Sequence, residues 1–507
     1  MLRRIVLFGA ATCLIASCAK EEKKTTEQLQ EVVPKAEIKV MVESELAAGN
    51  IFHWENASDE VVWSAGMLSD SVFSIGYTAE LGFDFENQIH TIDLKSEKWQ
   101  EARKGVEEQI LQYEMKARGE DLTIEDISPL GISEDFPHII VQLTSQALIA
   151  DLRAAENIRF VEPLGFNFED DAIKQRSGQG CNGSPSYNIN TNDYTTNAGN
   201  KIPWNFYTHS IDDAWTQSQG DNIRIAILDT GAANGQDNLG SQFTQGQSGS
   251  RNIIKQSTIY SGSWWWRSLD SPNDDCGHGT SMAGFAAAPR GTDGNATGVA
   301  YKANLQTINC SQDVIISTSN ERSGVRDALK KAADRSDTKI ISMSLGTPIS
   351  SSTVADGVYY AYNRGKLIFA AAGTSLSWTS WYPVIFPATM SQTTAVTGIR
   401  DGSSMQRCVT CHAGSQVDFV IVMERANDDD RTSLSLASSS NTPKYTGGSS
   451  CATATTAGIA ALVWAENPSA SRATVLQAMK DASQYYPSRH SDFGWGKLDA
   501  LQAVNNL

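Results

Sequence analysis

The chain has 507 residues, of which 40% are hydrophobic, and a formal net charge of −17 at pH 7. This length allows two or three domains with a sizeable core. The acidic excess argues against nucleic acid or an anionic membrane surface as a binding partner, because both repel a negatively charged protein.

The first 17 residues are predicted to be an export signal. Two arginines precede an apolar run, residues 5–15, that is too short for a helix that stays in a membrane. The run is followed by Ala16-Ser17-Cys18, which resembles the bacterial lipobox, so we expect Cys18 to be lipidated and to begin the mature chain. By resemblance to lipoprotein sorting rules, Ala19 favours the outer membrane of a bacterial cell envelope, with surface exposure. A plain secretory signal is the alternative.

Residues 18–60 are rich in Glu, Lys and Thr, which predicts a tether, and residues 61–88 are left unassigned. Between residues 89 and 165 the hydrophobic periodicity predicts strand, helix, strand, strand, helix and strand. This order is the ferredoxin-like arrangement, an α+β fold with no fixed function. The predicted elements are 90–94, 97–118, 127–132, 138–143, 145–155 and 158–163.

Residues 178–200 are dominated by Asn, Gly, Ser, Thr and Tyr without periodicity, and residues 166–201 are interpreted as a linker. From residue 202 to 507, short apolar strands alternate with helices. This pattern predicts a three-layer α/β domain with a mainly parallel sheet and an active site at the carboxyl ends of its strands. The predicted strands are 223–228, 305–309, 339–344 and 366–371, and the predicted helices are 278–288, 323–334 and 353–363.

Three short motifs supply an acid, a base and a nucleophile. Asp229 follows the first of these strands in Leu-Asp-Thr-Gly, His278 opens a helix in Gly-His-Gly-Thr, and Ser450 lies in Gly-Gly-Ser-Ser-Cys-Ala, where we place it first in a buried helix. Each residue alone has a simpler interpretation, as a strand-end carboxylate, a structural histidine or a helix cap. Together they fit a triad in which Asp229 orients His278, His278 takes the Ser450 proton and Ser450 attacks a carbonyl.

The three motifs, in this order, resemble those of the subtilisin-like serine peptidases, or subtilases, from residue 202 to the end of the chain. The resemblance implies a serine endopeptidase that cleaves protein substrates through a Ser450 acyl-enzyme without a cofactor, as a monomer. It also implies that residues 89–165 are a propeptide that assists folding and inhibits the enzyme until self-cleavage between residues 163 and 202. A scaffold that binds peptides without cleaving them is the alternative. A processing enzyme with one physiological substrate would share the chemistry.

The resemblance assigns further residues around the triad. The expected oxyanion donors are the Ser450 N–H and Thr374, which stands where the family has Asn. A threonine hydroxyl is shorter than an asparagine amide, so we expect a weaker contact with the oxyanion. The residues expected to pair with the substrate backbone or to wall its pocket are Ser344, Leu345, Gly346, Ala371, Ala372 and Gly373.

Of the eight cysteines, Cys13 lies in the predicted signal and Cys18 is the predicted lipidation site, and the other six allow fifteen pairings. For Cys276, a free thiol and a bridge, for instance to Cys310, both remain open. Cys408, Cys411 and His412 have the spacing of a c-type haem attachment site, but no second axial ligand is evident, so we favour a local disulfide or two surface thiols. Calcium is frequent in subtilases, yet no carboxylate cluster has ligand spacing, so no metal ligand is assigned.

Overall fold

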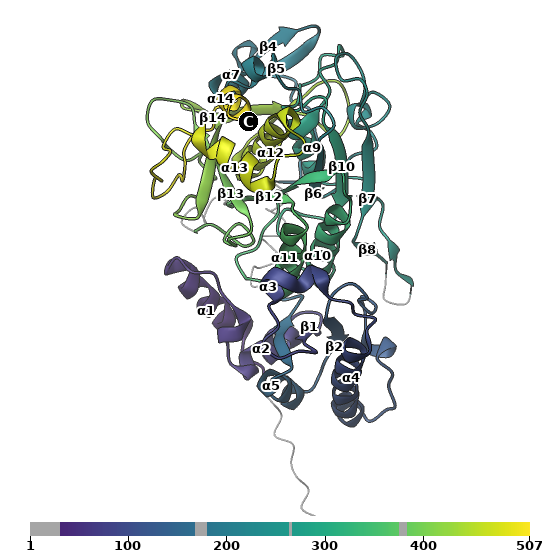
Figure 1. Cartoon of the computed structure of the whole chain (residues 1–507). Helices are drawn as coiled ribbons and strands as arrows, with labels where there is room; N and C mark the ends of the chain where they lie inside the picture. The colour runs from purple at the N-terminus through teal and green to yellow at the C-terminus, as the bar shows by residue number, and fades with distance from the viewer. Residues whose placement is uncertain (1–30, 168–179, 263–265, 375–382) are drawn as a thin grey trace, which may run out of the picture. The chain divides into compact units, whose positions relative to one another are not determined.

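The computed structural model describes residues 31–167, 180–262, 266–374 and 383–507 (Figure 1). The predicted export signal, Cys18 and residues 168–179 of the predicted linker lie outside the described residues. Within the described ranges, no helix is both long enough and apolar enough to cross a membrane.

A nine-stranded sheet organises the C-terminal domain, in the strand order β16-β15-β14-β13-β12-β11-β6-β10-β7. Neighbouring strands are parallel from β7 to β14, whereas β15 and β16 are antiparallel additions at one edge. The mainly parallel sheet confirms the predicted fold class. The strands are β6 (Arg224–Asp229), β7 (Ile253–Ser257), β10 (Asn304–Asn309), β11 (Thr338–Met343), β12 (Leu367–Ala371), β13 (Thr394–Arg400), β14 (Val417–Arg425), β15 (Asp428–Ser435) and β16 (Lys444–Thr446).

Helices cover both faces of this sheet (Figure 1). Ile225 and Ile227 of β6 pack into one core with α9 (His278–Ala287) and α12 (Gly448–Glu466). Ala226 and Leu228 point the other way, into a second core with α10 (Ser319–Ala333) and α11 (Ser352–Asn363). Burial on both faces explains why the strands read as continuous apolar runs, and it leaves their carboxyl ends at one edge for polar side chains.

Smaller elements complete the C-terminal domain. The hairpin of β4 (Tyr194–Asn197) and β5 (Asn200–Pro203) lies largely within the predicted linker, and Asp193 beside it accepts hydrogen bonds from Arg425 and Arg431. The second half of that linker is therefore part of the folded domain. The remaining elements are α7 (Trp204–Thr208), α8 (Ile211–Ala214), β8 (Tyr260–Ser261), β9 (Ser268–Leu269), α13 (Arg472–Asp481) and α14 (Ala500–Asn505).

The N-terminal domain contains a three-stranded antiparallel sheet in the order β2-β1-β3. The predicted helices are present as α4 (Glu97–Arg118) and α5 (Gln146–Ala154), and two predicted strands are present as β2 (His138–Gln142) and β3 (Ile158–Pro163). The first strand is β1 (Val72–Tyr77), in the stretch left unassigned from the sequence. All six β1 residues are buried, so the strand lacks the alternation of apolar and polar residues that identifies a half-exposed strand.

Two strand predictions in this domain are wrong. Residues 90–94 include part of a 3-10 turn, Ile89–Thr91, just ahead of α4. Residues 127–132 also form no strand, because Pro129 has no N–H for a ladder and Gly131 turns the chain with φ of +76°. The described residues therefore lack the edge strand of the predicted four-stranded ferredoxin-like sheet.

The predicted tether is folded over much of its length. Helix α1 (Lys35–Ala47) buries Ile38, Val42 and Leu46, which recur every four residues on one face. Helix α2 (Asp59–Met67) packs against α5, and α3 (Phe85–Gln88) lies against α11. The N-terminal domain thus begins before residue 40 rather than at residue 89.

Candidate active site

Asp229 and His278 lie together at the carboxyl edge of the sheet. Asp229 is the last residue of β6 and His278 is the first residue of α9, and their Oδ1 and Nδ1 atoms are 2.7 Å apart. Both side chains are buried, and the Thr230 N–H also donates to Asp229 Oδ1 at 2.8 Å. A carboxylate on Nδ1 fixes the imidazole tautomer, which leaves Nε2 able to accept a proton.

Ser450 lies in the first turn of α12. The helix begins at Gly448, which has φ of +90°, so Ser450 is its third residue rather than its first. Its side chain is partly exposed, whereas Ser449 and Cys451 on either side are buried. Backbone N–H groups in a first helical turn have no intrahelical acceptor, so they are available to a negatively charged oxygen.

The Ser450 hydroxyl donates to the Ser344 carbonyl, with Oγ and O 3.5 Å apart, and Ser344 Oγ donates to the Ser450 carbonyl at 3.0 Å. Among the described residues, no hydrogen bond joins Ser450 to His278. Catalytic hydrogen bonds are often long without substrate and tighten in the Michaelis complex. The structure thus brings Asp229 and His278 into contact, and the contact of His278 with Ser450 stays a prediction.

Thr374 contacts Ser449, the residue directly before Ser450. Its Oγ1 is 2.8 Å from Ser449 Oγ, and either hydroxyl can donate. The preceding Gly373 has φ of +125°, and a Cβ there would meet the His412 ring. The turn is therefore closely packed at Gly373, and Thr374, an exposed residue, has its hydroxyl beside the first turn of α12.

The expected substrate-binding edge is already paired within the chain. The Gly346 N–H donates to the Val314 carbonyl at 3.2 Å, and the Gly346 carbonyl accepts from the Ile316 N–H at 3.0 Å. A peptide that pairs with both polar groups of Gly346 has to separate these two segments first.

Two of the expected pocket residues have side chains in the core instead. Leu345 is buried with the residues beneath α10 and α11, and Ala372 is buried in a third cluster with Val384 and Ala395. These residues can contribute only backbone to a pocket wall. Ala371, also buried, is the last residue of β12.

Among the described residues, the cysteines form two disulfides, Cys181–Cys276 and Cys408–Cys411, so the suggested bridge from Cys276 to Cys310 is wrong. Cys310 and Cys451 are free and buried, and burial raises the pKa of both thiols. A protonated thiol is a poor nucleophile, which argues against either cysteine as the reacting group.

The Cys408–Cys411 disulfide is the local bridge favoured over haem attachment. Both sulfurs are used in the bridge, and the following His412 is buried with Nδ1 3.0 Å from the Pro383 carbonyl. These residues therefore do not fit a covalently attached haem. In the described part of the chain, no group of three or more His, Cys, Asp or Glu side chains is arranged to hold a metal ion, so calcium ligands stay unassigned.

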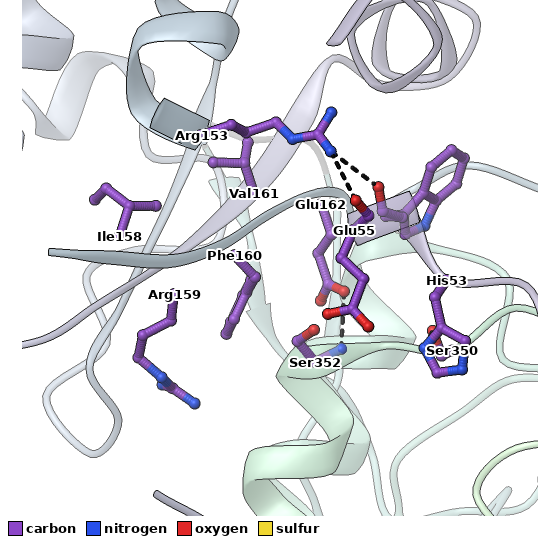
Figure 2. Close-up of a pocket in the computed structure, with 11 residues that line it drawn as sticks. His53, Glu55, Arg153, Ile158, Arg159, Phe160, Val161, Glu162, Ser350 and Ser352 are labelled. Carbon is purple, nitrogen blue, oxygen red and sulfur yellow. Dashed lines mark hydrogen bonds between the residues drawn. The ribbon is translucent and has the colours of Figure 1, made fainter. Parts of the chain in front are cut away.

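The N-terminal domain contacts the start of α11 through Glu162. Its carboxylate accepts a hydrogen bond from the Ser352 N–H at 2.8 Å (Figure 2) and another from the Thr353 N–H at 2.9 Å. Because these N–H groups lie in the first helical turn, the carboxylate caps α11 and faces the positive end of its dipole. A cavity of about 160 Å³ lies beside this contact, lined in part by His53, Arg153 and Arg159 (Figure 2).

A buried charge cluster joins the same two domains. Asp356 of α11 accepts two hydrogen bonds from Arg159 of β3, at 2.7 and 2.8 Å, and its Oδ2 is 2.5 Å from His138 Nε2. Burial lowers the pKa of His138 to about 4, although Asp356 opposes this shift. Burial would raise the pKa of Asp356, but Arg159 and His138 outweigh it and lower that pKa to about 2.

Known proteins resemble this chain in sequence and in fold. The model of the Subtilase family matches residues 220–496. Thermitase of Thermoactinomyces vulgaris is 28% identical over 292 residues, which cover 57% of this chain and 91% of thermitase. A subtilisin of Bacillus sp. strain TA39 is 28% identical over 318 residues, which cover 59% of this chain and 72% of that protein.

One solved structure extends the likeness to the N-terminal domain. Fervidolysin from Fervidobacterium pennivorans, described as a keratinolytic enzyme related to subtilisin, aligns with a TM-score of 0.58 over 86% of this chain and 60% of its own. At 16% sequence identity, this likeness concerns the fold alone.

Proposed function

Because this chain belongs to the subtilase family and is a serine endopeptidase, we propose that Ser450 attacks the scissile carbonyl while His278 takes its proton and Asp229 orients the imidazole. The protonated His278 then gives the proton to the leaving amine. In the second half of the reaction, His278 takes a proton from water, which attacks the acyl-enzyme and releases Ser450. The 2.7 Å contact of Asp229 with His278 carries this assignment. Denatured casein is a direct substrate test. An endopeptidase releases casein fragments, whereas an inert peptide-binding scaffold leaves casein intact. Membership of the protease family argues against the scaffold.

The tetrahedral intermediate carries a negatively charged oxygen. We propose that the Ser450 N–H and the Thr374 hydroxyl donate hydrogen bonds to this oxygen. The 2.8 Å contact with Ser449 supports this assignment. If Ser449 donates to Thr374, the Thr374 proton is free to point at the oxyanion. Donors held in place before the reaction stabilise developing charge without reorganisation.

Thr374→Val is expected to lower kcat about tenfold or more with little change in KM, because valine keeps the shape and loses the hydroxyl. Thr374→Ser is the matched control, since it keeps the hydroxyl, and Thr374→Asn is expected to exceed the wild-type kcat. Steady-state kinetics on one peptide substrate measure all three variants. A valine variant as fast as wild type contradicts the assignment.

The N-terminal domain acts as an inhibitory propeptide that is cut from the enzyme by self-cleavage between residues 163 and 202. Two observations bear on what happens after the cut. Cys181 is joined by a disulfide to Cys276, two residues before His278, and the Ser438 N–H donates to the Gly183 carbonyl at 2.8 Å. A cut before Cys181 would therefore leave the new N-terminus attached to the C-terminal domain.

Acid is expected to release the propeptide between about pH 6.5 and pH 4. In the complex the pKa of His138 is about 4, below its ordinary 6.5, so the separated domain binds a proton more readily and falling pH favours separation. The groups that face His138 are Asp356, Arg326 and Arg159, and Asp356 titrates only below this window. The rate at which activity appears in the cleaved complex is the measurement, and His138→Gln should flatten its pH profile. An unchanged profile in that variant contradicts this account.

Export through the N-terminal signal, and anchoring of the mature chain by a lipid on Cys18 at the outer membrane, complete the proposal. The Ala16-Ser17-Cys18 sequence supports it. One similar protease is named a minor extracellular protease. Protein substrates follow from the protease relatives, and we expect the enzyme to act as a monomer. Mass spectrometry of the mature protein measures the lipid and the position of the cut together.

A further inference from the structure

Besides Asp229, a second buried carboxylate lies close in sequence to the catalytic base. It is Asp274, in the loop that leads into α9, four residues before His278. Its two oxygens accept four hydrogen bonds. Oδ1 accepts from the Gly277 N–H at 2.6 Å and from Thr230 Oγ1 at 2.8 Å. Oδ2 accepts from the Thr280 N–H at 2.7 Å and from Thr280 Oγ1 at 2.6 Å. With all four donors buried, this carboxylate is held in one orientation.

Thr230 connects Asp274 to the catalytic acid. Its hydroxyl donates to Asp274 and accepts from the Gly279 N–H at 2.9 Å, while its backbone N–H donates to Asp229 Oδ1 at 2.8 Å. Among the described residues, the buried Asp229 Oδ2 has no hydrogen-bond partner. The orientation of the Asp229 carboxylate therefore depends on what holds Oδ1, namely Thr230 and His278.

The Asp274 carboxylate also holds the backbone on both sides of His278. Gly277 directly precedes His278, has φ of +86° and has no side chain with which to cap α9. Asp274 takes over that role by accepting from the Gly277 and Thr280 N–H groups. One carboxylate thus sets the backbone of the catalytic base and, through Thr230, the catalytic acid.

We propose that Asp274 is a positioning residue for peptide hydrolysis. It keeps the Asp229 carboxylate and the His278 imidazole in the relative position that proton transfer requires. This proposal rests on the triad assigned above. Proton transfer is steeply sensitive to geometry. A shift of Asp229 or His278 therefore lowers kcat, the rate of the chemical step, and changes KM much less. A carboxylate that only capped α9 would affect folding stability and leave kcat unchanged once the protein is folded.

The test is a pair of substitutions at Thr230, because they leave the contacts of Asp274 with α9 intact. Thr230→Val removes the hydroxyl and is expected to lower kcat about tenfold or more, with KM within about twofold of wild type. Thr230→Ser keeps the hydroxyl and is expected to restore the wild-type kcat. The rate of fluorophosphonate labelling of Ser450 is expected to follow kcat, since both report activation of the nucleophile.

Asp274→Asn provides a second variant, with an expected loss in kcat of about 10²-fold. Each carboxylate oxygen accepts from a backbone N–H, so the amide nitrogen of asparagine would face a donor in either orientation. Asp275→Asn is the matched control. It removes the same charge one residue later, on an exposed side chain bonded to Asn273, and is expected to keep the wild-type kcat.

A wild-type kcat in both Thr230→Val and Asp274→Asn overturns the positioning role. The same holds if Thr230→Ser loses as much kcat as Thr230→Val, because the hydroxyl then does not matter. Failure of the triad itself is recognised separately, since hydrolysis and labelling would then survive Ser450→Ala whatever the Thr230 variants do.

Discussion

Ser450→Ala is expected to abolish casein hydrolysis, self-cleavage of the N-terminal domain and fluorophosphonate labelling together. All three depend on the Ser450 oxygen as nucleophile, and alanine leaves His278 with no proton to take. Removal of the nucleophile from a serine peptidase of this type lowers kcat about 10⁶-fold. Activity measurements combined with gel analysis of the purified chain test this prediction, because the variant should remain at precursor length.

Ser469→Ala is the control for this experiment. Ser469 is an exposed serine just beyond the other end of α12, and its substitution is expected to change neither cleavage nor labelling. If the Ser450→Ala chain still cuts itself when purified away from other proteases, the nucleophile has been assigned to the wrong residue. If only the labelling persists, the probe reacts elsewhere.

Asp356→Asn is expected to release the N-terminal domain from the cleaved enzyme. The substitution leaves the Arg159 guanidinium facing a neutral amide in a buried site, and breaking a buried ion pair costs about 3–5 kcal/mol. This energy corresponds to a complex weakened by a factor of about 10² to about 4 × 10³. Size-exclusion chromatography of the cleaved complex and the lag before full activity both measure the effect. We expect the N-terminal domain to elute separately from the enzyme and the lag to be shorter than in wild type.

Asp481→Asn serves as the control for Asp356→Asn. Asp481 is an exposed carboxylate at the end of α13, and its hydrogen bond is with Gln477 of the same helix. It is expected to leave the complex and the lag unchanged. A variant at Asp356 that stays bound to its N-terminal domain as tightly as wild type would show that the buried charge cluster contributes little to inhibition.

Four of the nine strands of the C-terminal sheet, β6, β10, β11 and β12, begin and end within one residue of the predicted ranges. These strands are almost entirely buried, so they appear in the sequence as short apolar runs that end in turns and helices. Helix α10 begins at Ser319, four residues before the predicted start, because Thr318 and Glu321 form a capping box ahead of the apolar residues. The N-terminal domain was harder to predict, since β1 carries no alternation and Pro129 interrupts an apolar stretch that resembles a strand.

The sequence by itself determined which residues we propose as the catalytic acid, base and nucleophile. Asp229, His278 and Ser450 each lie in a local motif at the end of a strand or the start of a helix, and neighbouring residues specify such positions. Their order along the chain was enough to suggest a serine peptidase mechanism.

Only the tertiary structure decided which segments lie against them. The bridge from Cys181 to Cys276, the pairing of Gly346 with Val314 and Ile316, and the contact of Thr374 with Ser449 all join segments far apart in the sequence. Asp274 was missed for the same reason, because one of its four hydrogen bonds comes from Thr230, 44 positions earlier. Contacts of this kind depend on how the sheet aligns its strands, and no local pattern of residues encodes that alignment.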